Sequence, residues 1–219
     1  MDTSEKKVPE VVIKRLPRYY RYLDELAKEG KTRISSTALS KKMGVTASQI
    51  RQDFNYFGGF GQQGYGYNVQ YLLEELKKLL GISKGYKTVI VGAGNLGSAI
   101  ANYGGLKKRG FKLLGIFDKD ADKIGKCVGG VKISDISDAG RFVRENKIDV
   151  AILTLPKNET EKIADMLAES GIKGFWNFSY AELKSRDSVF VENVHLTDSL
   201  MTLSFKINQS EIREEFNGV

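Results

Sequence analysis

The spacing of hydrophobic residues divides this chain into two parts with different periods. Up to residue 80, apolar residues recur every three or four positions, which predicts amphipathic helices. These helices are expected over 10–28, over 37–43, from residue 47 onward and over 69–80. From residue 87, short apolar runs alternate with helical segments. Strands are predicted over 87–91, 111–117, 131–133, 149–155 and 172–178, and helices over 95–109, 136–146 and 159–170. That alternation predicts an α/β domain with a parallel, doubly wound sheet and helices on both faces.

The first part has the pattern of a helix-turn-helix. Pro17 predicts a kink or two short helices over 10–28. Ser36 is expected to cap the second helix, and the run Thr46-Ala47-Ser48-Gln49 is a capping box that opens the third. The glycine- and aromatic-rich segment 57–67 then predicts a β-hairpin with its tip at Gln62-Gln63-Gly64. Such a hairpin beside a helix-turn-helix is a wing, so the sequence predicts a winged-helix domain.

The third helix separates an apolar side from a polar one. Ile50, Phe54 and Phe57 form the expected core stripe. The polar side chains can donate hydrogen bonds to bases or phosphates. The alternative, which is commoner for any one helix, is that this side simply faces solvent. The net charge of +7 lies mostly before residue 81, which favours an anionic partner, while solvated lysines are the simpler explanation. The residues predicted to contact DNA are Ser48, Gln49, Arg51, Gln52, Asn55, Gln62, Gln63 and Tyr65.

A glycine motif lies between the first predicted strand and helix of the second part. Gly92, Gly94 and Gly97 fit G-x-G-x-x-G, in which the glycines allow a tight turn, close approach of a pyrophosphate and close helix-strand packing. Asp118 ends the second strand 21 residues after Gly97, where a carboxylate accepts from the ribose hydroxyls of NAD. A glycine-rich turn without a ligand is the alternative. The pattern favours a dinucleotide site.

Other features restrict the class of protein. One cysteine, Cys127, excludes an internal disulfide, offers no metal site and fits a reducing compartment. The N-terminus has no signal-peptide pattern and no apolar run approaches a membrane span, so we expect a soluble, cytoplasmic protein without a membrane partner. The segment 195–216 predicts one long helix. Its apolar residues must pack on the rest of the chain or on a second subunit.

Several short segments of this sequence together resemble the Rex family of NAD(H)-sensing transcriptional repressors. The resemblance runs from Val8 to about Ile207. The resemblance rests on the following segments: Ala47-Ser48-Gln49-Ile50-Arg51 with Asp53, Tyr56-Phe57-Gly58, Gly64-Tyr65-Gly66-Tyr67, Val91-Gly92-Ala93-Gly94-Asn95-Leu96-Gly97, Gly115-Ile116-Phe117-Asp118, Gly171-Ile172-Lys173-Gly174 and Asn177-Phe178.

The resemblance implies a winged-helix domain over 1–80, a Rossmann domain over 85–194 and a helix over 195–219 that is exchanged between the subunits of a homodimer. It implies binding to a palindromic operator when NADH is low and release when NADH binds. The implied cofactors are NADH and NAD. The residues expected at the cofactor are Gly92, Ala93, Gly94, Asn95, Leu96, Gly97, Tyr103, Asp118, Thr154, Leu155, Pro156, Asn177 and Phe178.

The resemblance also implies a switch that links the two domains, through Arg21 and Tyr103. The acid that usually accompanies them is His195 here, and Asp198 is the candidate substitute. Gln52 and the pair Gln62-Gln63 replace cations that are usual in the family. The alternatives are an NAD-dependent oxidoreductase and a methyltransferase. His195 is the only histidine and no Tyr-x-x-x-Lys follows the glycine motif, so we expect no enzyme activity.

Overall fold

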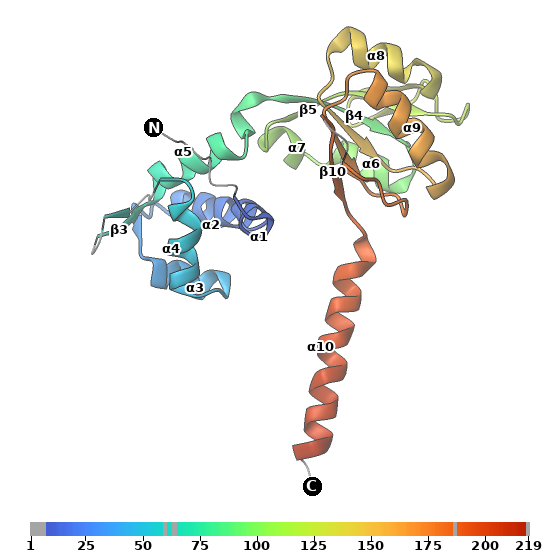
Figure 1. Ribbon diagram of the computed structural model, residues 1–219. Coiled ribbons are helices and arrows are strands. Elements are labelled where there is room, and N and C mark those ends of the chain that lie inside the picture. Colours follow the sequence, from blue (N-terminus) through green and yellow to red (C-terminus); the bar gives the residue numbers. More distant parts are fainter. Residues whose placement is uncertain (1–7, 59–60, 63–64, 186–187, 218–219) are drawn as a thin grey trace. The chain divides into compact units, whose positions relative to one another are not determined.

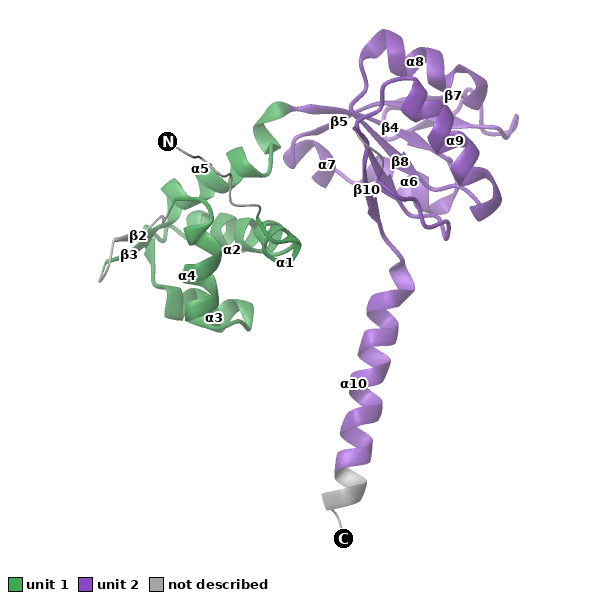
Figure 2. Ribbon diagram, in the orientation of Figure 1, with its two compact units in different colours: residues 1–84 green, residues 85–219 purple. Residues whose placement is uncertain are grey.

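The computed structural model describes residues 8–58, 61–62, 65–185 and 188–217, without the side chains of 61–62 and 214–217. The chain forms two compact units, residues 1–84 and residues 85–219 (Figures 1 and 2). The long last helix is counted with the second unit. That residues 195–219 form a region distinct from the Rossmann domain therefore remains a prediction, as do the other domain boundaries.

The first unit holds five α-helices and a small antiparallel sheet in its described residues, and the sheet has the order β1-β3-β2. The expected interruption near Pro17 is present, since the first helical segment consists of two helices. The elements are α1 (Glu10–Ile13), α2 (Leu16–Lys28), β1 (Arg33–Ile34), α3 (Ser36–Met43), α4 (Ala47–Asn55), β2 (Gly61–Gln62), β3 (Gly66–Asn68) and α5 (Val69–Leu79).

Helices α3 and α4 form the predicted helix-turn-helix. Gly44, at φ 64°, makes the left-handed turn between them, and the Thr46 hydroxyl caps α4 by accepting from the Gln49 N–H at 3.1 Å. The cap of α3 is Ser35, whose hydroxyl accepts from the Ala38 N–H. The expected cap Ser36 is wrong by one residue and is instead the first residue of the helix. Two adjacent serines offer the same chemistry, so the pattern did not separate them.

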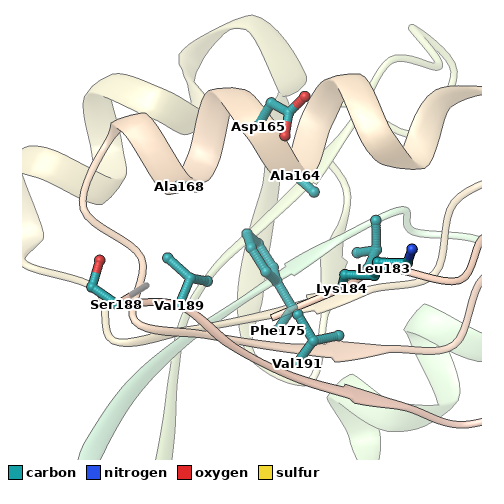
Figure 3. Close-up of a pocket in the computed structure, with 9 residues that line it drawn as sticks. All are labelled: Ala164, Asp165, Ala168, Phe175, Leu183, Lys184, Ser188, Val189 and Val191. Atoms are coloured by element: carbon teal, nitrogen blue, oxygen red, sulfur yellow. The ribbon is translucent and has the colours of Figure 1, made fainter. Parts of the chain in front are cut away.

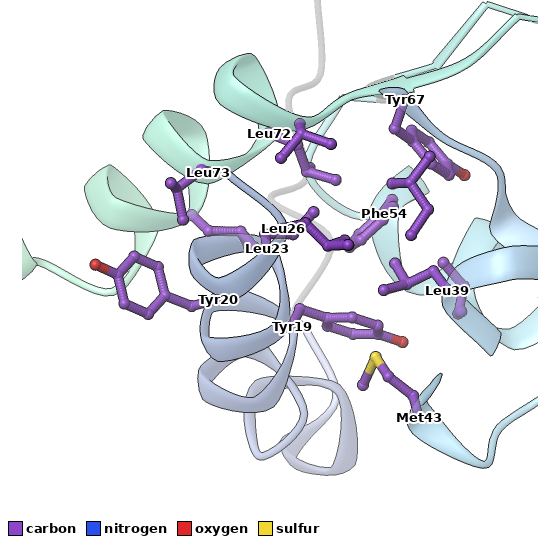
Figure 4. Packing of buried hydrophobic residues seen from close by; sticks show 14 of the residues in the cluster. Tyr19, Tyr20, Leu23, Leu26, Leu39, Met43, Phe54, Tyr67, Leu72 and Leu73 are labelled. Atoms are coloured by element: carbon purple, nitrogen blue, oxygen red, sulfur yellow. The ribbon is translucent and has the colours of Figure 1, made fainter. Parts of the chain in front are cut away.

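One hydrophobic core joins the helices of the first unit to its sheet. The rings of Tyr19 in α2, Phe54 in α4 and Tyr67 in β3 pack in series, tilted and edge-on, with centroids 4.9 and 5.1 Å apart (Figure 4). Leu72 and Leu76 of α5 are fully buried in the same cluster. Leu79, the last residue of α5, is 45% exposed.

Asp53 of α4 is buried beside this core and has three side-chain partners. Arg15, which precedes α2, donates to both carboxylate oxygens at 2.7 Å, the Tyr19 hydroxyl donates at 2.6 Å, and the Gln49 amide donates at 2.9 Å. Burial alone would raise the pKa of the Asp53 carboxyl. The hydrogen bonds from Arg15, Tyr19 and Gln49 outweigh burial and lower it. This network fixes α4 against the start of α2.

The second unit is a seven-stranded sheet in the order β10-β9-β8-β4-β5-β7-β6. All neighbours are parallel except β6, which is antiparallel to β7. Its strands are β4 (Tyr86–Val91), β5 (Phe111–Asp118), β6 (Cys127–Val128), β7 (Val131–Asp135), β8 (Val150–Leu153), β9 (Gly174–Asn177) and β10 (Phe190–Asn193). Its α-helices are α6 (Asn95–Asn102), α7 (Gly105–Lys108), α8 (Ala139–Asn146), α9 (Lys157–Glu169) and α10 (Leu196–Asn217), and a short 3₁₀ helix covers Ile136–Asp138. Another 3₁₀ helix, Ile82–Lys84, ends the first unit.

Successive residues of a strand face opposite sides of the sheet, and a separate layer of helices covers each side. Val89 and Val91 belong to the cluster that includes residues of α8 and α9, whereas Ile90 belongs to the cluster against which Ile100 of α6 and Leu106 of α7 pack. Both faces of β4 are therefore covered, as the continuous apolar run predicted. The chain leaves β4 first toward β5 and later returns on its other side as β8. In open α/β sheets, ligands bind in a crevice at such a reversal, which lies here at the carboxyl end of β4.

Two predictions for the second unit are wrong. The helix expected over 95–109 breaks at Tyr103, whose ψ of 103° ends α6, and α7 begins after Gly104. Two consecutive glycines are poor helix formers, which explains the break. The strands β6 and β10 were not predicted, because each has four residues or fewer and lies at a sheet edge. The edge strand β10 leads directly into α10.

The Asp53 network makes a testable contribution to the stability of the first unit. Replacing Asp53 by Asn removes the charge-assisted pair with Arg15, and we expect a loss of about 2–3 kcal/mol in the free energy of unfolding at pH 7. Because folding lowers the pKa of Asp53, this contribution is complete above the unfolded carboxyl pKa of about 3.9 and decreases as the pH falls below it. The difference in the free energy of unfolding between the unaltered protein and Asp53→Asn should therefore decrease below pH ~4.

Urea unfolding at several pH values, followed by circular dichroism, measures this difference. Asp24→Asn is the matched control, because Asp24 forms only a surface pair with Lys28 and its loss should change stability by less than about 1 kcal/mol. Fluorescence of Trp176, the single tryptophan, reports the second unit and should be unchanged in both variants. Equal losses in Asp53→Asn and Asp24→Asn would contradict the prediction.

Candidate functional site

The glycine loop follows β4 at the switch point of the sheet and is braced from both sides. The Gly92 N–H donates to the Phe117 carbonyl of β5 at 2.8 Å. The Thr154 hydroxyl, just after β8, donates to the Gly92 carbonyl at 2.7 Å, and the Thr154 N–H donates to the Val91 carbonyl at 2.9 Å. The loop is thus held by the two strands that flank β4.

Glycine occupies each of the three positions of the motif for a different reason. Gly92 has φ 103°, a conformation that favours glycine, and a Cβ there would lie 2.6 Å from the Thr154 carbonyl oxygen. A Cβ at Gly97 would lie 1.9 Å from the Gly92 carbonyl oxygen. Gly94 differs, because its φ of −73° suits any residue and a Cβ would meet no atom of the chain within 4 Å. The chain itself does not require glycine at 94, but an approaching pyrophosphate does.

The start of α6 completes a place for an anion. Gly94 is the N-cap, and no side chain caps the first turn formed by Asn95, Leu96 and Gly97. The N–H groups of such a turn, together with the positive end of the helix dipole, favour a phosphate. The predicted pyrophosphate-binding residues therefore lie together, and their geometry fits a dinucleotide.

Asp118 lies at the end of β5 beside the same loop. Its carboxylate accepts from the Ala93 N–H at 2.6 Å and from the Asp120 N–H at 2.9 Å, and Lys123 lies 3.4 Å away. Burial would raise the pKa of this carboxyl, but the Asp120 and Ala93 hydrogen bonds and the Lys123 charge outweigh it and lower the pKa. A carboxylate has about four acceptor positions, so Asp118 can brace the loop and still accept from ribose hydroxyls.

The residues expected around the nicotinamide follow β8 and β9. Leu155 and Phe178 are partly buried, Pro156 is exposed, and Phe178 packs edge-on against Trp176 at 4.6 Å. Asn177 is fully buried and its side chain is already engaged. Its amide donates to the Ala181 carbonyl and to Asn193, and its oxygen accepts from the Ser179 N–H. Asn177 thus shapes the turn after β9 rather than presenting a free polar group.

Tyr103 lies at the break between α6 and α7, not within a helix as predicted. Its side chain is 66% exposed. A Cβ on Gly105 would lie 2.2 Å from the Tyr103 ring, so the absence of a side chain at 105 allows the ring to lie over α7.

The exposed side of α4 carries most of the residues predicted to contact DNA. Ser48, Arg51, Gln52 and Asn55 are exposed, and Arg51 donates to the Ser36 hydroxyl at 2.9 Å. Gln49 is partly buried, and its amide donates to the buried carboxylate of Asp53. Gln49 therefore supports the helix, and its contact with DNA stays a prediction.

A cation that sequence reasoning missed lies beside the wing. Arg33 of β1 is exposed, donates to the Tyr65 carbonyl at 3.2 Å, and has its guanidinium 5.9 Å from the centre of the Tyr65 ring. The pairing of β1 with β3 brings it there, and no local signal marks it. Tyr65 is 71% exposed. Of the two predicted wing-tip residues, Gln63 lies outside the described residues, and Gln62 is placed in β2 without its side chain.

The predicted switch residues lie in both units. Arg21 is exposed on α2, with its guanidinium 5.7 Å from the Tyr22 ring. His195 precedes α10, where its Nε2 lies 3.1 Å from a carboxylate oxygen of Glu182 and its ring stacks on Tyr180. Asp198 is exposed in the first turn of α10. His195 therefore has an acidic partner in its own subunit.

A separate cavity of about 200 Å³ lies between α9 and the strands β9 and β10 (Figure 3). Phe175, Val189 and Val191 give it an apolar wall, and it includes none of the residues predicted to bind the nucleotide. Within the described residues, no group of three or more His, Cys, Asp or Glu side chains is placed to hold a metal ion. No helix in that part of the chain is long and apolar enough to cross a membrane.

Two family models match this chain, one in each unit. Residues 7–55 match the family described as "Putative DNA-binding protein N-terminus", and residues 83–181 match the family described as "CoA binding domain". The first covers the helix-turn-helix, and the second covers the glycine loop and most of the parallel sheet.

Curated relatives match over nearly the full length. The chain is 53% identical to the redox-sensing transcriptional repressor Rex of Thermoanaerobacter pseudethanolicus over 99% of this chain and 96% of that one. It is 49% identical to the Rex of Caldicellulosiruptor saccharolyticus over 97% of both chains.

Solved structures of a Rex-family repressor named RSP are similar throughout. RSP in complex with β-NAD⁺ and operator DNA has a TM-score of 0.88 and 53% identity, over 96% of this chain and 97% of that chain. RSP in complex with β-NADH has a TM-score of 0.89 and 50% identity, over 96% and 99%. The fold predicted from the sequence is confirmed by these similarities.

The glycine geometry predicts opposite effects for two alanine substitutions. Gly94→Ala should leave the stability of the second unit within about 0.5 kcal/mol, because a methyl group there meets nothing. It should weaken NADH binding, because the methyl group occupies the space of the pyrophosphate. Gly97→Ala should destabilise the unit by about 2 kcal/mol or more, because its methyl group overlaps the Gly92 carbonyl.

Urea unfolding monitored by Trp176 fluorescence measures stability, and calorimetric titration measures NADH affinity. A destabilised Gly94→Ala that binds NADH normally would show that the space beside Gly94 has no connection with the cofactor.

Proposed function

We propose, from the premise that this chain belongs to the Rex family of redox-sensing transcriptional repressors, that it binds operator DNA when NADH is scarce and leaves it when NADH binds. It is a regulator rather than an enzyme, as its relatives are. The observation that carries the proposal is the presence in one chain of a helix-turn-helix with a wing and of a glycine loop with open space beside Gly94. A DNA-binding repressor of this kind acts in the cytoplasm.

Each part of the cofactor has expected partners in the second unit. The pyrophosphate would lie beside Gly94 at the N-terminus of α6, and the adenosine ribose would donate to Asp118. The nicotinamide would then extend toward Thr154, Leu155 and Phe178. NAD and NADH share the first two contacts, so they differ only at the ring.

The DNA contacts would come from α4 and from the wing. Arg51 and Gln52 have side chains that can pair bidentately with base edges, while Ser48 and Asn55 supply further donors. Arg33 and Tyr65 on the wing sheet are suited to the phosphate backbone. Arg33 would take over the role of the cation that is missing at Gln62-Gln63.

The tail helix α10 supports a two-fold dimer. At about 100° per residue, Leu196, Leu200, Leu203 and Ile207 form a stripe on one side, and Met201, Phe205 and Ile212 form a second stripe on the opposite side. All seven are exposed in the single chain. A helix that is apolar on two sides requires two surfaces, which suits a helix exchanged between subunits. A two-fold dimer also matches a palindromic operator.

The switch would act through the difference between the two nicotinamide rings. The oxidised ring is positively charged, and burial of a charge without a partner is unfavourable, whereas the neutral reduced ring can be enclosed between subunits. NADH would then favour a dimer whose recognition helices no longer match two successive segments of the major groove. We place Tyr103 beside the ring, and Arg21, His195 and Asp198 along the connection to the DNA-binding unit.

This proposal predicts reciprocal coupling of the two ligands. NADH should weaken operator binding by about 5- to 150-fold, and saturating operator should weaken NADH binding by the same factor. NADH affinity measured with and without operator at one fixed salt concentration tests it, because DNA affinity itself depends on salt. NAD is the matched control and should show a smaller effect. Identical NADH affinities in the two measurements would exclude release by NADH.

The dimer makes a separate prediction. Leu203→Glu places a charge in the first stripe of α10 and should shift the protein to monomers or aggregates and abolish operator binding. Thr202→Glu introduces the same charge at the neighbouring exposed position outside both stripes, and should have little effect. Sedimentation over a range of protein concentrations compares them. A Leu203→Glu protein that remains a dimer and binds operator would exclude this role for α10.

A further inference from the structure

Lys119 and Glu159 form an ion pair across the crevice at the carboxyl end of the sheet. Lys119 follows β5 directly after Asp118, and Glu159 lies in the first turn of α9, after β8. Their Nζ and Oε1 atoms are 2.5 Å apart. Since β5 and β8 lie on opposite sides of β4, this pair connects the two segments that flank the glycine loop.

The pair changes the charge that a nucleotide meets next to Asp118. Two lysines follow this carboxylate closely in the sequence, and each has an acidic partner. Lys123 pairs with Asp118 and Asp120, and Lys119 pairs with Glu159. The two ammonium groups therefore have three carboxylate partners. A ribose with free hydroxyls suits this group, whereas a 2′-phosphate needs a cation that is not already neutralised.

The position of Lys119 makes its partner important. A basic side chain directly after the ribose-binding acid is well placed to meet a 2′-phosphate, and Lys119 is 64% exposed on a flexible stem. Glu159 is 25% exposed and belongs to a helix of 13 residues, so it is the more fixed member of the pair. Glu159 thus neutralises the ammonium group of Lys119.

We propose that Glu159 is a positioning residue for cofactor selectivity, which by pairing with Lys119 strengthens the preference of this protein for NADH over NADPH. The inference rests on the proposed function, because it takes the glycine loop and Asp118 as the dinucleotide site. It assigns the selectivity to two elements, the acid at the end of β5 and the ion pair that spans the crevice. Asp118 alone would discriminate less, since Lys119 would be available to the additional phosphate.

Calorimetric titration of the full-length protein with NADH and with NADPH tests this assignment. Glu159→Gln frees Lys119 and should raise NADPH affinity by about 3- to 10-fold, while NADH affinity changes by less than about twofold. The gain should decrease with added salt, because it is electrostatic and exposed. Glu161→Gln is the matched control, since it removes the same charge from an exposed position two residues further along α9.

A double-mutant cycle with Lys119 separates the ion pair from a general change of charge. Lys119→Gln should weaken NADPH binding, and Glu159→Gln should have little further effect in that background. An unchanged ratio of NADPH to NADH affinity in Glu159→Gln, with NADH still bound tightly, would overturn this inference alone. An equal effect of Glu161→Gln would also overturn it. Failure of the unaltered protein to bind NADH would overturn the proposed function and this inference with it.

Discussion

The orientation of the recognition helix depends on the buried carboxylate of Asp53. A charge in a protein interior is unfavourable unless it is paired and hydrogen-bonded, and Arg15, Tyr19 and Gln49 satisfy Asp53 from three positions. These partners come from the start of α2 and from α4 itself, so the network defines both the position and the rotation of α4. The residues that face outward, among them Arg51, are exposed because the opposite side of the helix is held so specifically.

A second carboxylate has a comparable role in the nucleotide-binding unit. Asp118 accepts from the Ala93 N–H and so connects the end of β5 to the glycine loop, while Thr154 connects the loop to the segment after β8. The residue expected to select the ribose is thus also a structural part of the phosphate-binding loop. A substitution of Asp118 would therefore change both cofactor selectivity and the shape of the loop, whereas the side chains of Glu159 and Lys119 pair with each other rather than with the loop.

Local patterns in the sequence predicted the elements well and their environments less well. The G-x-G-x-x-G spacing and the helix-turn-helix cap are encoded by neighbouring residues, so both could be placed without the structure. The inward direction of Gln49 depends on Asp53 one turn later and on Arg15 from another helix. Arg33 reaches the wing only through strand pairing, and the short edge strand β10 is defined by its neighbour β9. Such information is tertiary, and periodicity does not contain it.

The bracing of the glycine loop has a consequence for the cofactor concentration at which the protein responds. The contacts that shape the loop include those from Phe117, Asp118 and Thr154. A preorganised loop loses little conformational entropy when a ligand binds, so less of the binding free energy is consumed in ordering it. NAD and NADH carry the same pyrophosphate, so both gain equally and the difference between them is left to the nicotinamide ring. Rigidity at the phosphates thus lowers the total cofactor concentration that the protein detects, and the ring alone reports its redox state.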